Sequence, residues 1–165
     1  MSEPKTFENY ITELVGEESV YVTDRSVDAV GDYKGHVEEL FALTEGALEL
    51  QSFEGEEEVE VWHVVLGVGG AEHRLTFDYN RGWIDNDNLV LGLNKILSEN
   101  DVAERICWFW AADSFGQEVG FFCGTPEQIA SVFKYAGAKN KRVKGVASKL
   151  RQVSDGINDE GFADL

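Results

Sequence analysis

The chain has 165 residues, of which 43% are apolar and 12% aromatic, so it has the length of one domain and is too apolar to be a disordered chain. Its 31 acidic and 14 basic residues give a formal charge of −17, which argues against a protein that grips nucleic-acid phosphates with a basic face. No apolar run is long enough to span a membrane and the first residues lack a signal-peptide pattern, so we expect a soluble cytoplasmic domain.

The first third of the chain predicts two helices separated by a short strand. Residues 6–15 carry apolar side chains at helical spacing, and residues 19–23 are a β-prone run. Residues 24–35 are polar and contain two glycines, which favours a loop. Residues 36–44 fit either a helix or a strand, and of the two we favour the helix.

The middle of the chain predicts three antiparallel strands in a β-meander. The strands are expected at residues 47–53, 59–66 and 72–79, where apolar and polar side chains alternate. The turns between them are expected at residues 55–58 and 67–70.

The second turn of this meander sets which side chains face each other. If it centres on residues 68–69, His63 lies opposite His73, and Trp62 lies beside Arg74 on the other face in a cation–π contact. Two histidines could begin a zinc site, but a structural zinc site needs four ligands and a catalytic one about three. We therefore expect hydrogen-bonded histidines and no metal.

The second half predicts a helix followed by an aromatic hairpin. Asn86 or Asp87 can cap a helix that runs to about residue 98. Residues 104–111 are β-prone and rich in aromatic side chains, and residues 118–123 return as their partner strand.

A capping motif then opens a further helix. Thr125 is an expected N-cap, Pro126 suits the first turn, and Gln128 completes a capping box, while Gly137 is expected to end the helix. Residues 141–153 fit one more amphipathic helix. We therefore predict a single α+β domain over residues 1–153, with about five or six mostly antiparallel strands and about three to five helices. Residues 154–165 are expected to form a flexible tail.

Motifs that carry chemistry are few. Cys107 and Cys123 flank the turn near residue 115 and are expected to lie across from each other as reduced, partly buried thiols. Residues 78–87 are rich in Asp and Asn but lack the bidentate Glu of a calcium loop, so we expect a turn and a helix cap. Nucleophile-elbow, P-loop and zinc-protease patterns are missing, so no catalytic residue or cofactor is expected.

The charge is unevenly distributed along the chain. Residues 1–133 carry a net charge of −20, and residues 134–165 carry +3. The basic segment 139–151 is expected to dock on the acidic body and not to bind nucleic acid or lipid. The acidic surface is either a solvated surface or an attractor for a basic partner. The densest acidic cluster is Glu54, Glu56, Glu57, Glu58 and Glu60.

Four tryptophans are the second candidate binding feature. Most tryptophans are core residues, but one that is exposed beside acidic groups would suit a binding hot spot. The four are Trp62, Trp83, Trp108 and Trp110.

The order of segments over about residues 47–137 resembles bacterial immunity proteins of polymorphic and contact-dependent growth-inhibition toxin systems. The segments concerned are TFDYNRGWIDNDN, LVLGLNKIL, ICWFWAADSFGQEVGFF and GTPEQIASVFKYAG. The resemblance rests on layout, size and charge. It implies a cytoplasmic inhibitor that covers an essential face of a cognate toxin, often a nuclease.

Three hypotheses about function follow. The first is an immunity-type binding protein without catalysis, in which the acidic cluster attracts a basic toxin and nearby tryptophans anchor it. The second is a nucleic-acid mimic that blocks DNA-binding enzymes, which needs carboxylates spaced like phosphates along an elongated body. The third is a small hydrolase or metal-binding enzyme that uses His63, His73 or a carboxylate pair.

Overall fold

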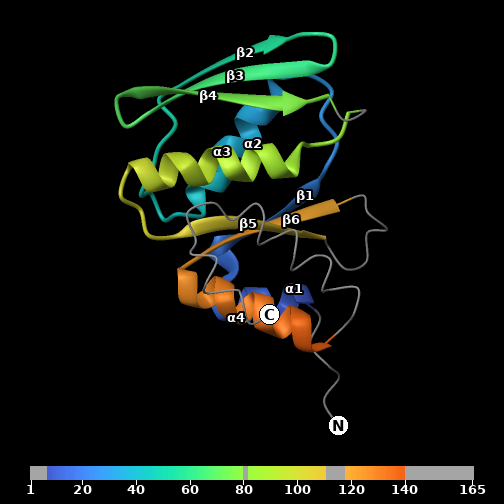
Figure 1. Cartoon of the computed structure of the whole chain (residues 1–165), viewed down its shortest axis with the longest axis vertical. Coiled ribbons are helices and arrows are strands. Elements are labelled where there is room, and N and C mark those ends of the chain that lie inside the picture. Colours follow the sequence, from blue (N-terminus) through green and yellow to red (C-terminus); the bar gives the residue numbers. More distant parts are fainter. Residues whose placement is uncertain (1–6, 80–81, 111–117, 140–165) are drawn as a thin grey trace.

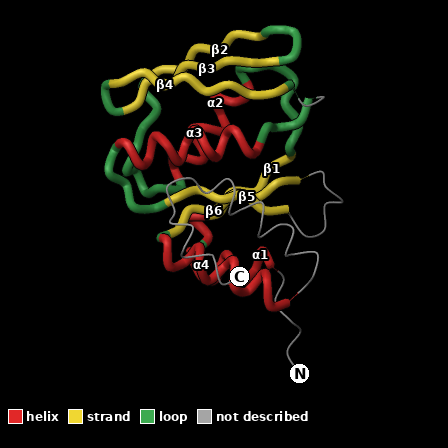
Figure 2. The backbone as a smooth tube through the Cα atoms, viewed as in Figure 1, coloured by secondary structure: helices red, strands yellow, loops and turns green. Residues whose placement is uncertain are grey.

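Two antiparallel sheets alternate with two pairs of helices, so the molecule is built in four layers (Figures 1 and 2). The computed structural model describes residues 7–79, 82–110 and 118–139. The outer sheet is followed by α2 (Asp32–Ala42) and α3 (Asn86–Glu99), then by the inner sheet, and then by α1 (Phe7–Val15) and α4 (Pro126–Lys139). Over the described ranges this is the predicted α+β fold, with six strands and four α-helices.

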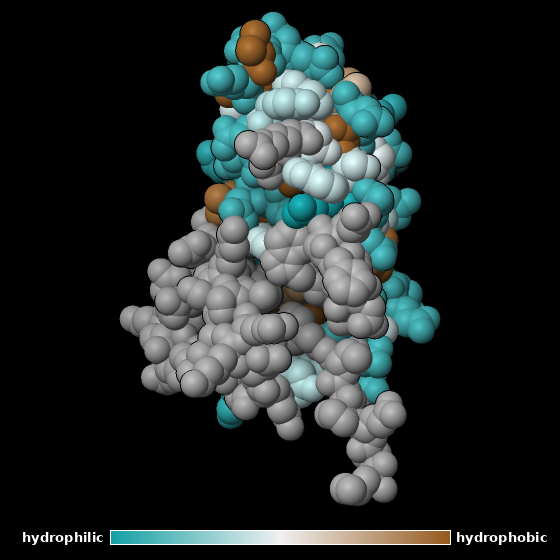
Figure 3. Space-filling view, turned by 90° about the vertical axis from the view of Figure 1, so that its right-hand side faces the viewer, coloured by the Kyte–Doolittle hydropathy of each residue, from teal (hydrophilic) through white to brown (hydrophobic). Residues whose placement is uncertain are grey.

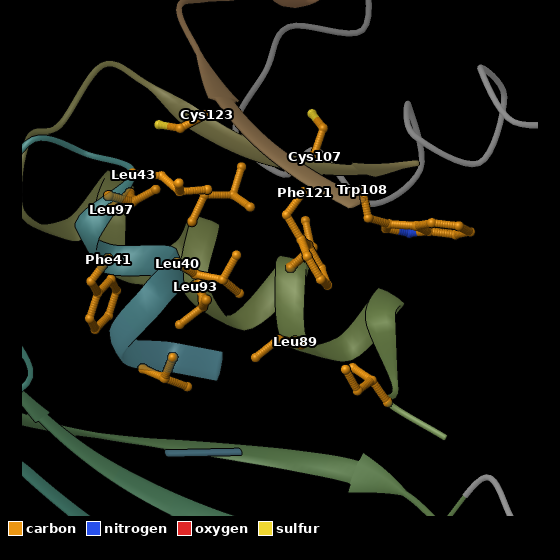
Figure 4. Close-up of a cluster of buried hydrophobic side chains, with 14 of the residues drawn as sticks. Leu40, Phe41, Leu43, Leu89, Leu93, Leu97, Cys107, Trp108, Phe121 and Cys123 are labelled. Carbon is orange, nitrogen blue, oxygen red and sulfur yellow. The ribbon is translucent and has the colours of Figure 1, made fainter. Parts of the chain in front are cut away.

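The inner sheet has the strand order β1-β6-β5 and is covered on both faces. β1 (Val20–Asp24) and β5 (Arg105–Trp110) each pair antiparallel with β6 (Glu118–Gly124). Phe121 lies on the face toward α2 and α3 (Figure 4), and Phe109 belongs to the opposite face. Both side chains are fully buried, because helices cover both faces of this sheet.

The outer sheet has the order β2-β3-β4 and is covered on one face only. It consists of β2 (Ser52–Glu57), β3 (Val61–Val68) and β4 (Ala71–Asp78). Its inner face packs on the two middle helices, and its other face lies at the outside of the molecule (Figure 1). The buried apolar side chains of the inner face include Trp62, Val64, Leu66, Leu75 and Phe77.

The register of the β3–β4 hairpin differs from the predicted one by three residues. The turn residues are Gly69 and Gly70, whose φ angles are both positive, 61° and 80°, and Val68 pairs with Ala71 across the turn. His63 pairs with Thr76, and Leu66 pairs with His73. Because the shift is odd, the other face of β3 is paired with the apolar face of β4: Trp62 lies beside Phe77 on the buried side, and His63 lies beside Thr76 on the open side.

The boundaries of the first meander strand were also predicted wrongly. β2 begins at Ser52 and continues to Glu57, through the residues predicted as a turn, and residues 58–60 connect it to β3. The acidic cluster is therefore carried by a strand and its following turn, and residues 47–51 have no regular secondary structure.

The predicted helices form, with small differences at their ends. The helix predicted at residues 36–44 begins earlier, at Asp32, and the N-cap of α3 is Asp85, whose side chain accepts from the Asn88 N–H. The predicted capping box of α4 is present, but the helix continues past Gly137. The predictions for residues 141–153 and 154–165 lie outside the described residues.

A buried polar contact fixes α3 against the inner sheet. The side chain of Asn94 donates to the Ile106 carbonyl at 2.8 Å and accepts from the Ile106 N–H at 2.7 Å. Asn94 therefore satisfies the open edge of β5 inside the core, where an unpaired backbone group would be costly. Figure 4 shows Leu89, Leu93 and Leu97 of α3 near this strand. None of the described helices is long and apolar enough to cross a membrane.

Candidate partner-binding surface

The solvent-facing side of the outer sheet, which we call the open face, is dominated by carboxylates. Strand pairing places Glu56 beside His63 and Thr76 in one row across the three strands, and Glu54 beside Val65 and Arg74 in the next. The further acidic side chains on this face are Glu58, Glu72 and Asp78, all exposed. Arg74 is the one arginine or lysine on the three strands, so the open face has a negative potential.

The negative charge extends from the open face into α2 and its flanking loops. Residues 28–60 contain eleven carboxylates and one lysine, a net charge of −10. All eleven carboxylates are exposed, and the lysine, Lys34, is 4.0 Å from Glu38 on the same helix. Every member of the predicted acidic cluster lies within this segment, which we call the acidic segment.

A groove opens on the acidic segment between α2 and the start of β2. It has a volume of about 440 Å³. Phe41, Leu48 and Phe53 contribute apolar surface, and Glu38, Glu49 and Lys34 contribute two negative charges and one positive. The groove can therefore receive an apolar side chain next to a positive one.

The four tryptophans separate into different environments. Trp62 and Trp108 are predicted partner anchors, but they are 7% and 1% exposed, so neither ring offers contact surface to a partner in this structure. Trp62 lies edge-on to the Tyr33 ring, and the Trp108 indole donates to an Asp87 carboxylate oxygen at 3.0 Å. Both are core residues because their rings fill the space between a sheet and the middle helices.

Trp83 is the tryptophan that stays partly exposed. The guanidinium of Arg25 lies 4.0 Å from the centre of its ring, so the cation–π contact involves this pair and not Trp62 with Arg74. The side chain of Trp110 lies outside the described side chains.

Two large apolar side chains are exposed at the end of the outer sheet that holds residues 58–60, which we call the acidic turn. Val59 in that turn is 93% exposed, and Tyr79, directly after β4, is 50% exposed. Their backbones lie close together, because the Tyr79 N–H donates to the carbonyl of Glu60, the residue after Val59, at 2.8 Å. Figure 3 shows this side of the molecule, with a hydrophobic spot among hydrophilic residues at the top. Tyrosine is among the residues enriched in protein–protein interfaces.

Hydrogen bonds to side chains hold this end of the outer sheet in place. Asp85 accepts from the Asp78 N–H at 2.8 Å, and its own N–H donates to the Tyr33 hydroxyl at 2.9 Å. Glu57 accepts from the Val30 N–H at 2.8 Å. The acidic turn is thus tied to the loop before α2, which keeps the carboxylates in a defined arrangement.

The two histidines of the meander lie on opposite faces and do not form a site together. His63 on the open face is 3.4 Å from Glu58 and 3.1 Å from the Thr76 hydroxyl. His73 points the other way, 3.4 Å from Glu99 of α3. Over the described ranges, no group of three or more His, Cys, Asp or Glu side chains could hold a metal ion.

The two cysteines are buried on opposite faces of the inner sheet. Cys107 pairs with Phe122, and Cys123 pairs with Ile106, so the predicted position across from each other is wrong by one residue. Burial raises the pKa of the Cys123 thiol to about 12, and the nearby carboxylate of Glu104 adds to the increase. This thiol is therefore protonated near neutral pH and a poor nucleophile.

Sequence reasoning missed Tyr79 and the groove. Tyr79 was placed inside a strand, although a tyrosine next to the polar pair Asn80 and Arg81 is a signal for the end of a strand. The groove depends on how α2 packs under β2, and no local pattern encodes that contact.

No family model, no curated protein and no solved structure gives a significant match to the chain.

Proposed function

We propose that this chain is a non-catalytic binding protein that captures and neutralises a basic protein partner, as an immunity protein does with its cognate toxin. The observation that carries the proposal is the acidic segment, with eleven exposed carboxylates and a net charge of −10 over residues 28–60. A surface of one sign attracts a partner of the other sign and raises its association rate.

Apolar side chains beside the charge give such a complex its lifetime. Electrostatic attraction mainly sets how fast partners meet, while buried aromatic and apolar contacts mainly set how slowly they separate. Val59 and Tyr79 supply apolar surface at the acidic turn, and the partly exposed Trp83 supplies more beside Arg25.

The proposed partner is a protein with a basic face, and a nuclease toxin fits because it must bind phosphates. The acidic segment would repel nucleic acid itself. We place the encounter in the cytoplasm, since two cysteines buried on opposite faces of one sheet are not bridged to each other and suit a reducing compartment.

Co-expression with the protein encoded next to this chain tests the proposal. We expect the chain to co-purify with that protein and to restore the growth of cells that produce it. Glu54→Lys combined with Glu56→Lys should abolish both effects, because it reverses charge on the open face. Glu17→Lys combined with Glu18→Lys is the matched control, since both residues are exposed after α1 and should leave rescue intact. Neither co-purification nor rescue by the unmodified chain would remove the proposal.

A further inference from the structure

β2 is an edge strand, and its outer edge is open. Among the described residues β2 pairs only with β3. The Glu58 N–H donates to the Val61 carbonyl at 3.0 Å, which fixes the direction in which the backbone groups alternate. Because alternate residues of a strand direct their N–H and C=O groups to opposite edges, those of Phe53, Gly55 and Glu57 face outward.

The two sides of this edge differ in chemistry. Glu54 and Glu56 lie on the open face, so a strand added to β2 would have side chains within about 5 Å of these carboxylates. On the inner side lie Phe53, Gly55 and Glu57, and the side chain of Val30 lies directly beneath Gly55. From Ser52 to Glu56 the edge is therefore acidic on the open face and apolar on the inner side, and Glu57 adds a carboxylate to the inner side at the end of the strand.

The groove between α2 and β2 continues the apolar side. Ser52 and Phe53 of β2 line it together with Phe41 and Ala42 of α2. Its volume of about 440 Å³ exceeds that of a single large side chain, so a residue from an added strand can enter it.

We propose that the basic partner adds a strand to the outer edge of β2. The added segment alternates basic residues, which face Glu54, Glu56 and Glu58, with apolar residues, one of which enters the groove. Backbone hydrogen bonds to the outward groups of β2 supply affinity, and the alternation supplies specificity. This inference rests on the proposed function, because it names the surface and the mode by which the partner is captured.

Charge decides against a second copy of this chain as the occupant. Two β2 strands laid side by side would bring their glutamates together, and like charges directly opposite each other destabilise a strand pair. Charged side chains on an edge strand commonly prevent such self-association. The same charges favour a strand that carries lysine or arginine at the facing positions.

Two synthetic peptides test this mode of binding. One is an eight-residue capped peptide of alternating lysine and valine, and the other has the same composition in two blocks. We expect the alternating peptide to bind about tenfold more tightly in calorimetric titration. Hydrogen exchange followed by NMR should show slower exchange at the Phe53, Gly55 and Glu57 amides, while the Glu54 and Glu56 amides, already bonded to β3, change little.

A variant that fills the groove separates strand addition from simple charge attraction. Ala42 is exposed and lines the groove, so Ala42→Trp should weaken the alternating peptide several-fold without changing any charge. The equally exposed Ala103, which does not line the groove, provides the control Ala103→Trp.

Equal affinity for the two peptides, or no change at the outward amides, would overturn strand addition at β2. The growth-rescue experiment is independent of both results. If the chain restores growth but binds both peptides equally, the partner is captured on another part of the acidic segment. If the chain does not restore growth, the proposed function itself is removed.

Discussion

Tyr33 shows how single polar groups are placed inside this fold. Its ring stacks on Phe77 at 4.0 Å, and its hydroxyl accepts from the Asp85 N–H at the end of the outer sheet. Burial raises the pKa of the phenol, so the hydroxyl stays protonated over the physiological range. One residue of α2 thus connects the core to the loop that carries Trp83.

His36 should make the stability of the protein depend on pH. Burial lowers its pKa below the ordinary 6.5, although the carboxylates of Asp32 and Glu39 oppose this effect. Because the unfolded chain then binds a proton more readily than the folded one, stability is highest above about pH 6.5 and falls as pH decreases. In His36→Gln, the free energy of unfolding should change less between pH 7.5 and 5.5 than in the unmodified protein. Parallel curves for the two proteins, measured by chemical denaturation, would contradict this expectation.

At the scale of elements, the two helices of the outermost layer are joined to each other by specific contacts. Tyr10 of α1 stacks on Tyr135 of α4, with ring centres 3.9 Å apart. Gln128 in the first turn of α4 donates to the Leu14 carbonyl at 3.2 Å. The N-terminus of α4 is therefore linked to the C-terminal end of α1.

Removing the α4 cap should weaken this layer. Thr125 accepts from the Gln128 N–H at 3.2 Å, and its own N–H donates to the Gln128 side chain at 2.9 Å. Thr125→Ala should lower the free energy of unfolding by about 1 kcal/mol, whereas Thr125→Ser should keep the cap and most of the stability. Denaturant titration of the three proteins measures the difference, and equal losses in both variants would show that the cap does not stabilise the helix.

At the scale of the whole molecule, charge is concentrated in the outer sheet and in α2. Many carboxylates of one sign near each other repel, so this arrangement reduces stability. A surface that costs stability is common where a protein binds a partner, because the repulsion is relieved only in the complex. The inner sheet and the α1–α4 layer bear no comparable cluster among the described residues.

Neutralising part of this charge should stabilise the free protein. Replacing Glu54, Glu56 and Glu58 by Gln together should raise the melting temperature by about 1–3 °C at low ionic strength and reduce its increase with added salt. Thermal unfolding at 10 mM and 300 mM salt compares the triple variant with the unmodified chain. A lower melting temperature at low salt would show that these carboxylates stabilise the fold.

The sequence by itself determined the types of the elements and their order. Periodicity, the capping box at Thr125 and the glycines after the strands are local signals, and they act within a few residues. The charge imbalance was likewise readable without a structure, because it depends only on composition.

Tertiary structure alone decided which faces are buried and which edge is open. β3 has apolar residues on both sides, with Val61 and Val65 on one and Trp62 and Val64 on the other, so alternation could not select the buried face. The selection came from the turn at Gly69, together with the helices that cover one side of the sheet. The open edge of β2 and its groove exist because α2 packs beneath it, and contacts between distant segments leave no periodic signal in the sequence.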